Sequence, residues 1–170
     1  STLQTLSTPA VVIDLDIARR NIDRFQAYAD KNGLKVRPHI KTHKLPAVAE
    51  MQLRAGAIGV TCQKVSEAEA MIAASPEITD VLITYNILGA EKLGHLTALA
   101  QKVTLSVVAD NETVIDGLSG AFASEPAPSR VLVECNTGAD RCGVPTPEAA
   151  AALAQRIAKA PGLVFGGLMT

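Results

Sequence analysis

The sequence has no tryptophan, and aromatic residues make up only 3% of its 170 residues. Its three cysteines, Cys62, Cys135 and Cys142, form no Cys-X-X-Cys pair. An odd number of widely spaced cysteines argues against a disulfide framework and against a cysteine-rich zinc site. We therefore expect the protein to work in a reducing compartment, the cytoplasm.

Neither sign of charge is in clear excess, because 16 Lys and Arg stand against 17 Asp and Glu, a net charge of -1. A chain without a broad positive field is not expected to bind nucleic acid or an anionic membrane surface. No apolar run approaches the ~20 residues of a membrane-spanning helix. The first residues also lack the basic and apolar regions of a secretion signal. We expect neither a nucleic-acid partner nor a membrane partner.

Apolar residues make up 48% of the chain, enough for the core of one domain. Short runs rich in β-branched residues alternate with alanine-rich segments that have helical spacing. This alternation predicts parallel strands with helices on the outer faces. The expected strands are 10–15, 34–40, 58–62, 80–85, 103–109, 130–136 and 163–169, and the expected helices are 16–33, 45–56, 65–75, 89–102, 111–124 and 146–160.

Two architectures fit this alternation, an open doubly wound sheet and a closed barrel. Neither a Gly-X-Gly-X-X-Gly fingerprint nor a P-loop follows any expected strand, so the doubly wound sheet lacks its usual support. A complete barrel usually takes ~250 residues, and here about six strands follow the opening one. We therefore predict an α/β fold of the TIM-type (β/α)8 class, of which residues 1–170 form an incomplete amino-terminal part.

Several residues mark the expected starts of helices. Ser66 and Glu69 have the spacing of a capping box, and Thr146 before Pro147 fits an N-cap followed by proline at the first helical position. Gln63 lies just past an expected strand and before a capped helix. Two interpretations of Gln63 stay open, a contact with a ligand and a simple loop hydrogen bond.

The stretch "VRPHIKTHKLP", residues 36–46, concentrates basic and titratable side chains in an otherwise apolar chain. Because side chains alternate along a strand, Arg37, His39 and Lys41 share one face and the residues between them share the other. In a barrel the apolar set would meet the helices and the polar set would face the lumen. Unpaired charge there is costly, so a bound anion would explain the pattern.

Lys41 lies at the end of this expected strand, where barrel enzymes gather their reactive groups. Neighbouring positive groups favour a neutral lysine amine, the nucleophile that forms a Schiff base. Alternatives stay open: a solvated basic loop, or pairing of Arg37 and His39 with acidic side chains. A metal pair formed by His39 and His43 is disfavoured, because Pro38 makes a helix across them improbable.

A second constellation is "VECNTGADRCGV", residues 133–144, in which an expected strand runs into a tight turn. Arg141 in that turn would stand over the same barrel mouth as Lys41. The alternative role for Arg141 is an ion pair with Glu134 or Asp140.

Four stretches together carry a family resemblance: "TPAVVIDLDIARRNI", "VRPHIKTHKLP", "GVTCQKVSEAEAM" and "VECNTGADRCGV". They resemble the alanine-racemase-like, fold type III enzymes that use pyridoxal 5'-phosphate (PLP), and among them the branch of D-threonine aldolase and D-serine dehydratase. The resemblance covers nearly the whole chain in order. The KADAYGHG-type stretch of true alanine racemases is absent, which counts against a racemase.

The resemblance implies roles for individual residues. Lys41 matches the lysine that binds PLP covalently, and Arg141 matches the arginine that hydrogen-bonds the phenolic oxygen of PLP. Residues 1–15 would include an opening strand that joins a β-rich second domain expected beyond Thr170, and residues 16–170 would form part of the PLP-binding barrel. No metal ligand is assigned within residues 1–170.

The resemblance also implies an activity, a PLP-dependent lyase that cleaves D-3-hydroxy amino acids to glycine and an aldehyde. We expect a divalent metal (Mn, Mg or Zn) to assist through ligands outside residues 1–170, and a homodimer. The alternatives are a D-serine or D-3-hydroxyaspartate dehydratase, an amino-acid racemase, a non-catalytic PLP carrier and a phosphate-sugar barrel enzyme without PLP. We take Gln63 as a further candidate contact for the cofactor.

Overall fold

A parallel sheet of five strands forms the centre of the computed structural model, which describes residues 2–170. The strands lie side by side in the order in which they occur along the chain. A doubly wound sheet would reverse its strand order at a switch point, so the sequential order confirms the barrel prediction. The strands are β1 (Val60–Cys62), β2 (Asp80–Ile83), β3 (Thr104–Ala109), β4 (Ser129–Glu134) and β5 (Leu163–Met169).

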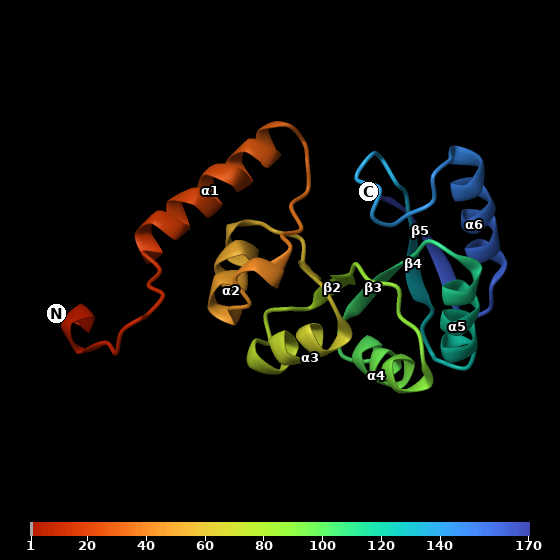
Figure 1. Ribbon diagram of the computed structural model, residues 1–170, viewed down its shortest axis with the longest axis horizontal. Helices are drawn as coiled ribbons and strands as arrows, with labels where there is room; N and C mark the ends of the chain where they lie inside the picture. The colour runs from red at the N-terminus through yellow and green to blue at the C-terminus, as the bar shows by residue number, and fades with distance from the viewer. Residues whose placement is uncertain (1) are drawn as a thin grey trace.

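After β1, the helices follow one another along the outer face of the curved sheet (Figure 1). Each expected helix is present, with ends that move by only a few residues. Within the described part of the chain, no helix is both long and apolar enough to cross a bilayer. The α-helices are α1 (Leu15–Lys31), α2 (Pro46–Ala55), α3 (Val65–Ala74), α4 (Ala90–Ala100), α5 (Glu112–Phe122) and α6 (Pro147–Lys159), and the 3-10 helices are η1 (Thr2–Thr5) and η2 (Ile40–Thr42).

The first strand expected for the barrel is present as an extended segment beside β1 rather than as a regular strand. His39 forms a single parallel bridge with Thr61. The backbone N–H of Ile58 donates to the Val36 carbonyl at 2.9 Å, and the N–H of Thr61 donates to the Pro38 carbonyl at 2.8 Å. Proline lacks an N–H and so limits the ladder. Val36 and Pro38 line a shallow hollow with residues of α1 and α2, as the strand pattern predicted.

The opening segment, residues 10–14, forms no strand among the described residues. Val11 is 97% exposed, and Figure 1 shows the amino-terminal segment and α1 extending from the rest of the chain. Asp14 ends the segment by accepting hydrogen bonds from the N–H groups of Asp16 and Ile17, both at 3.0 Å. The pairing expected for this segment involves a second domain, so it stays a prediction.

The core lies between the sheet and its helices. Alternate residues of each strand point outward, and the outward set on β2, β3 and β4 is fully buried against the helices. Burying one such aliphatic side chain contributes about 1.5–3 kcal/mol, so this layer fixes the sheet against its helices. The central members are Val81, Ile83, Val107, Val131 and Val133 on the strands and Leu96, Ile115, Leu118 and Ile157 on the helices.

Helix capping is partly as predicted. The Thr146 hydroxyl accepts from the Ala149 N–H at 3.2 Å, which confirms that N-cap. The capping box predicted for Ser66 and Glu69 is wrong, because α3 begins at Val65, two residues earlier than that spacing requires. The acid at the third helical position is therefore Glu67.

Candidate functional site

The polar residues before Lys41 face the inner side of the sheet. The Arg37 Nη1 atom lies 2.7 Å from the Asp80 carboxylate, and His39 Nε2 lies 3.4 Å from the Thr84 hydroxyl. Asp80 in β2 and Thr84 directly after it lie on the side opposite the buried Val81 and Ile83, so the alternation is confirmed for Arg37 and His39. It does not extend to Lys41, which lies in η2 rather than in a strand. Pairing with an acidic side chain accounts for Arg37, so its charge requires no bound anion.

Lys41 lies in a closed turn at the carboxyl end of the extended segment. The turn consists of η2 and ends where the Lys44 N–H donates to the Ile40 carbonyl at 2.8 Å. Ile40 is fully buried and anchors the turn, whereas Lys41 is exposed. Within residues 2–170, the Lys41 amine forms no hydrogen bond or ion pair. The turn thus presents a primary amine that is available for reaction.

Two histidines flank this lysine because each caps the local backbone. His39 Nδ1 accepts from the Lys41 N–H at 3.4 Å, and His43 Nδ1 accepts from the Leu45 N–H at 3.0 Å. Burial is the largest cause that lowers the pKa of each imidazole, and the Lys41 charge adds to the effect on His39. Both rings therefore favour the neutral form that an acceptor nitrogen requires. With each Nδ1 engaged in this way, the arrangement does not favour a metal pair.

Glu67 connects the Lys41 turn to the turn that follows β1. Its carboxylate is buried, accepts from the Gln63 N–H at 2.7 Å and forms an ion pair with the Lys44 ammonium. Burial raises the pKa of Glu67, but the Gln63 N–H and the Lys44 ammonium outweigh it, so the pKa lies below its usual value. Sequence reasoning missed Glu67, although counting three positions from the actual start of α3 identifies it.

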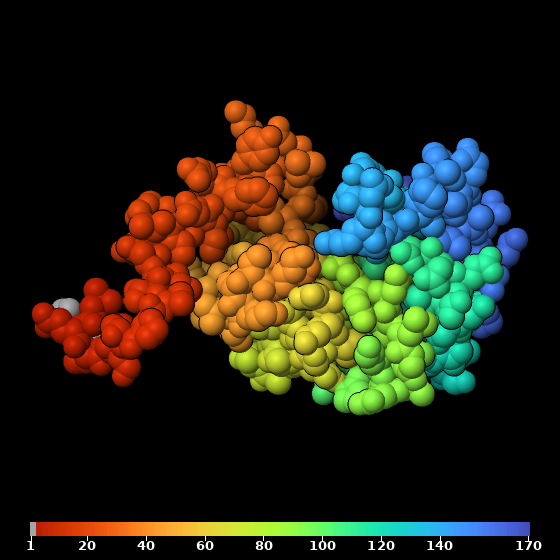
Figure 2. All heavy atoms as spheres, viewed as in Figure 1, coloured from red at the N-terminus to blue at the C-terminus, as the bar shows by residue number. Residues whose placement is uncertain are grey.

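Arg141 lies in the loop between β4 and α6, at the same edge of the sheet as Lys41, because both follow the carboxyl ends of parallel segments. Figure 2 shows the light-blue surface of this part of the chain across a notch from the orange surface of the earlier part. Arg141 is exposed and has no ion pair with Glu134 or Asp140 in the described structure. The alternative role predicted for it is therefore not found.

Asp110 holds the Arg141 loop in place from the end of β3. Its carboxylate accepts from Asn86 Nδ2 at 2.8 Å, from Asn111 Nδ2 at 2.8 Å and from the Gly143 N–H at 3.0 Å. Burial raises the pKa of Asp110, but these donors, led by Gly143, leave it below its usual value. The network joins the loops after β2, β3 and β4, and nothing in the local sequence around Asp110 indicated it.

The base of the Arg141 loop contains a buried carboxylate, that of Glu134. Cys142 donates its S–H to Glu134 Oε1 at 2.9 Å, and Glu134 is only 7% exposed. This hydrogen bond raises the pKa of the Cys142 thiol. Cys142 therefore acts as a hydrogen-bond donor within the loop rather than as a reactive thiolate.

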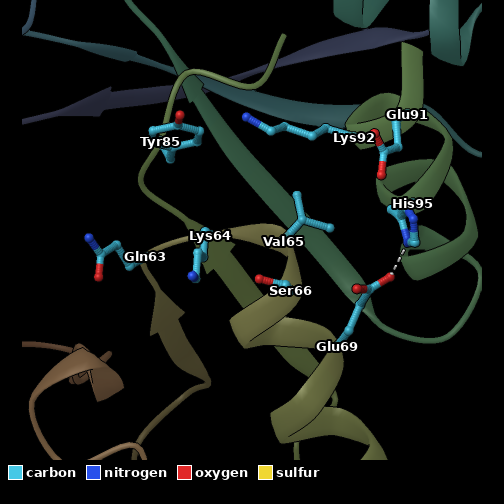
Figure 3. A pocket seen from close by; sticks show the side chains of 9 residues that line it. All are labelled: Gln63, Lys64, Val65, Ser66, Glu69, Tyr85, Glu91, Lys92 and His95. Atoms are coloured by element: carbon cyan, nitrogen blue, oxygen red, sulfur yellow. Dashed lines mark hydrogen bonds and ion pairs between the residues drawn. The ribbon is translucent and has the colours of Figure 1, made fainter. Parts of the chain in front are cut away.

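Gln63 lines the edge of a cavity of about 330 Å³ between the beginnings of α3 and α4. Figure 3 shows the Gln63 side chain directed away from Lys92 and His95, while Lys92 reaches toward Tyr85. The Lys92 ammonium lies 5.5 Å from the centre of the Tyr85 ring. The residues that line this cavity include none of the Lys41 turn, and the cofactor contact predicted for Gln63 stays a prediction.

A known family accounts for this arrangement of strand ends. The profile of the family described as "Alanine racemase, N-terminal domain" matches residues 13–170. The chain belongs to this family. The match begins just before α1 and includes Lys41, Gln63 and Arg141.

Proteins in this family with named activities resemble the chain over almost its full length. It is 40% identical over 166 residues to a D-threonine aldolase of Arthrobacter sp and 34% identical over 170 residues to a D-threo-3-hydroxyaspartate dehydratase of Delftia sp., covering 98% and 99% of this chain. The crystal structure of D-threonine aldolase from Filomicrobium marinum superimposes with a TM-score of 0.91 at 43% identity, over 95% of this chain. The chain spans 43%, 44% and 43% of these three proteins, respectively.

The residues of the mouth fit PLP, the cofactor expected for the family. Lys41 offers an amine that no described side chain engages, and Arg141 offers an exposed cation at the same edge of the sheet. The described residues contain no group of three or more His, Cys, Asp or Glu side chains placed to hold a metal. The roles assigned to Lys41 and Arg141 stay predictions.

Proposed function

We propose that the protein is a PLP-dependent lyase that cleaves D-3-hydroxy amino acids, with D-threonine aldolase as the favoured activity. The observation that carries the proposal is the 40% identity to a D-threonine aldolase across 98% of this chain. The available amine of Lys41 at the barrel mouth supports it. The 34% identity to a D-threo-3-hydroxyaspartate dehydratase favours a dehydratase as the second candidate.

The proposal gives each residue of the mouth a task. Lys41 would hold PLP covalently, and Arg141 would place a positive charge beside the phenolic oxygen of PLP. Gln63 would contact the cofactor from the loop after β1. When bound, PLP supplies an electron sink for the bond that breaks at the substrate Cα. The buried Glu67 and the half-buried Asp110 would hold the loops that carry these groups.

Further parts of the proposal concern the protein beyond this site. A divalent metal, Mn, Mg or Zn, would require ligands outside residues 1–170. We propose a homodimer in the cytoplasm, where the free thiols of Cys62, Cys135 and Cys142 would stay reduced.

Product analysis tests the proposal. The full-length protein, supplied with PLP and a divalent metal, is incubated with D-threonine and with D-serine. Glycine and an aldehyde identify an aldolase, whereas an oxo acid with ammonia identifies a dehydratase. A change in stereochemistry alone identifies a racemase. A protein that binds PLP without turnover supports the carrier alternative, and one that binds no PLP contradicts the proposal.

A further inference from the structure

We propose that Glu67 is a positioning residue for Lys41, and that it acts through its ion pair with Lys44. The inference deepens the proposed function and depends on it, because it concerns how the PLP-binding amine is held. Glu67 lies in the first turn of α3, whereas Lys41 lies in η2, so no sequence neighbourhood connects them.

The Glu67 carboxylate is fixed by its surroundings. Its side chain is 5% exposed, and the Gln63 N–H donates to Oε2 at 2.7 Å while the Lys44 ammonium pairs with Oε1. A buried carboxylate is costly unless charge and hydrogen bonds compensate it. Loss of the Lys44 ammonium would leave a charge that the remaining N–H of Gln63 compensates only in part. Glu67 therefore holds Lys44 at a defined position.

Lys44 in turn determines the shape of the Lys41 turn. Its backbone N–H closes the turn on the Ile40 carbonyl at 2.8 Å, and its φ of 54° ends the turn in the left-handed region. Its side chain reaches Glu67, so both the backbone and the side chain of one residue are anchored. Lys41 lies between Ile40 and Lys44, the two residues whose backbone hydrogen bond closes the turn.

The charge of Glu67 also reaches the imidazoles on both sides of Lys41. It favours the protonated forms of His39 and His43, against the stronger effect of burial. Removing this charge would shift both histidines further toward the neutral form. Glu67 thus influences the Lys41 turn in two ways. It forms the ion pair with Lys44, and its negative charge acts on the imidazoles of His39 and His43.

Glu69 provides a matched control on the same helix. It pairs with His95 at 2.7 Å, and both side chains are partly exposed, at 38% for Glu69 and 55% for His95. Figure 3 shows this pair at the α4 side of α3. Glu69→Gln therefore removes the same charge from the same helix without touching the Lys41 turn.

The experiment uses the full-length holoenzyme with Glu67→Gln, Lys44→Met, Lys44→Arg, the Glu67→Gln/Lys44→Met double variant and Glu69→Gln. PLP dissociation is followed by visible absorbance, and the pH midpoint of that absorbance is measured. The fraction of Lys41 carrying PLP is measured by mass spectrometry after borohydride reduction, and thermal midpoints report folding. We expect Glu67→Gln and Lys44→Met each to weaken PLP retention on the order of tenfold, the lower end of what loss of an orienting partner costs at metal sites. Both variants should also shift the pH midpoint.

The double variant should lose no more than either single variant, because the two residues act as one unit. Lys44→Arg should restore retention, and Glu69→Gln should match the wild type. Wild-type retention and pH midpoint in Glu67→Gln and Lys44→Met, or fully additive losses in the double variant, would overturn the inference. If Glu67→Gln does not fold, Lys44→Met decides, since the Lys44 side chain is 59% exposed. A wild-type protein without PLP on Lys41 would instead overturn the proposed function, and this inference with it.

Discussion

Arg37 and Asp80 form a partly buried ion pair, with Nη1 and Oδ1 2.7 Å apart and side chains 21% and 31% exposed. The pair joins the extended segment before Lys41 to the first residue of β2. It packs over Gly59, where an added Cβ would lie 2.4 Å from Arg37 Nη1. The ion pair therefore links these two neighbouring segments on the inner side of the barrel, at the amino ends of its strands.

Removing the Asp80 charge should destabilise the fold. Asp80→Asn leaves the Arg37 guanidinium without its anion, and the free energy of unfolding should fall by about 1–3 kcal/mol. Urea unfolding followed by circular dichroism measures this in the full-length protein. Glu77→Gln is the control, because its partner Arg54 is exposed and such pairs contribute little. Equal losses in the two variants would contradict the prediction.

Lys41→Ala should abolish covalent attachment of PLP and lower turnover by at least about a thousandfold, since no other group supplies the attached amine. Visible absorbance and mass spectrometry after borohydride reduction check the attachment. Lys35→Ala, a change at an exposed lysine at the start of the extended segment that precedes Lys41, should behave as the wild type. A Lys41→Ala protein that keeps both colour and turnover would remove the role assigned to Lys41.

Stability should fall on mild acidification because His39 and His43 are held neutral. Their pKa values in the fold are lowered from 6.5, chiefly by burial. The contribution of the two neutral histidines to the free energy of unfolding is therefore complete above their unfolded-state pKa. It is lost as the pH falls through their lower folded-state pKa values. Urea midpoints measured from pH 7.5 downward, at about half-unit steps across the ordinary histidine range, should show this decline.

A double variant isolates the contribution of the histidines. His39→Asn and His43→Asn keep a side-chain acceptor near each Nδ1 position but remove the titration. The decline below pH 6.5 should shrink in this variant. His95→Gln serves as the control, since His95 pairs with Glu69 at the surface. An unchanged pH dependence in the double variant would show that other groups cause the decline.

Asp110→Ala should loosen the Arg141 loop. The change removes the acceptor of the Gly143 N–H and strands the Asn86 amide, so local stability should fall by about 1–3 kcal/mol. Hydrogen exchange of peptides that cover the loop should accelerate, and PLP retention should weaken. Asp116→Ala, which breaks a surface contact with Arg156, is the control. Unaltered exchange at Gly143 would contradict the prediction.

Local periodicity predicted the fold well, and it did so for a physical reason. Strands buried under helices need continuous β-branched runs, and surface helices need one apolar face, so β3 and α6 are visible in the sequence alone. The run at Val11 and Val12 has the same composition but is exposed, so composition alone does not determine which apolar runs are buried. The alternation of side chains along a strand likewise predicted correctly that Arg37 and His39 lie on the inner face of the sheet.

The site was predictable only where its chemistry is local in sequence. The Lys41 turn and the Arg141 loop each lie within one short motif. The residues that hold them do not: Glu67 pairs with Lys44 across 23 positions, and Asp110 reaches Gly143 across 33. Such partners are determined by how adjacent strand ends pack together. They have no fixed separation in the sequence by which they could be recognised.

Lys44 occupies a backbone conformation that glycine or asparagine adopts more easily, and for other residues it costs about 1–2 kcal/mol. Glycine at this position would relax the main chain but would leave the carboxylate beneath it without a counter-charge. Glycine would thus have the lowest backbone strain at position 44 in the isolated loop, but it cannot form the ion pair that the folded barrel contains. Consensus or glycine substitutions intended to stabilise this protein should therefore not include Lys44.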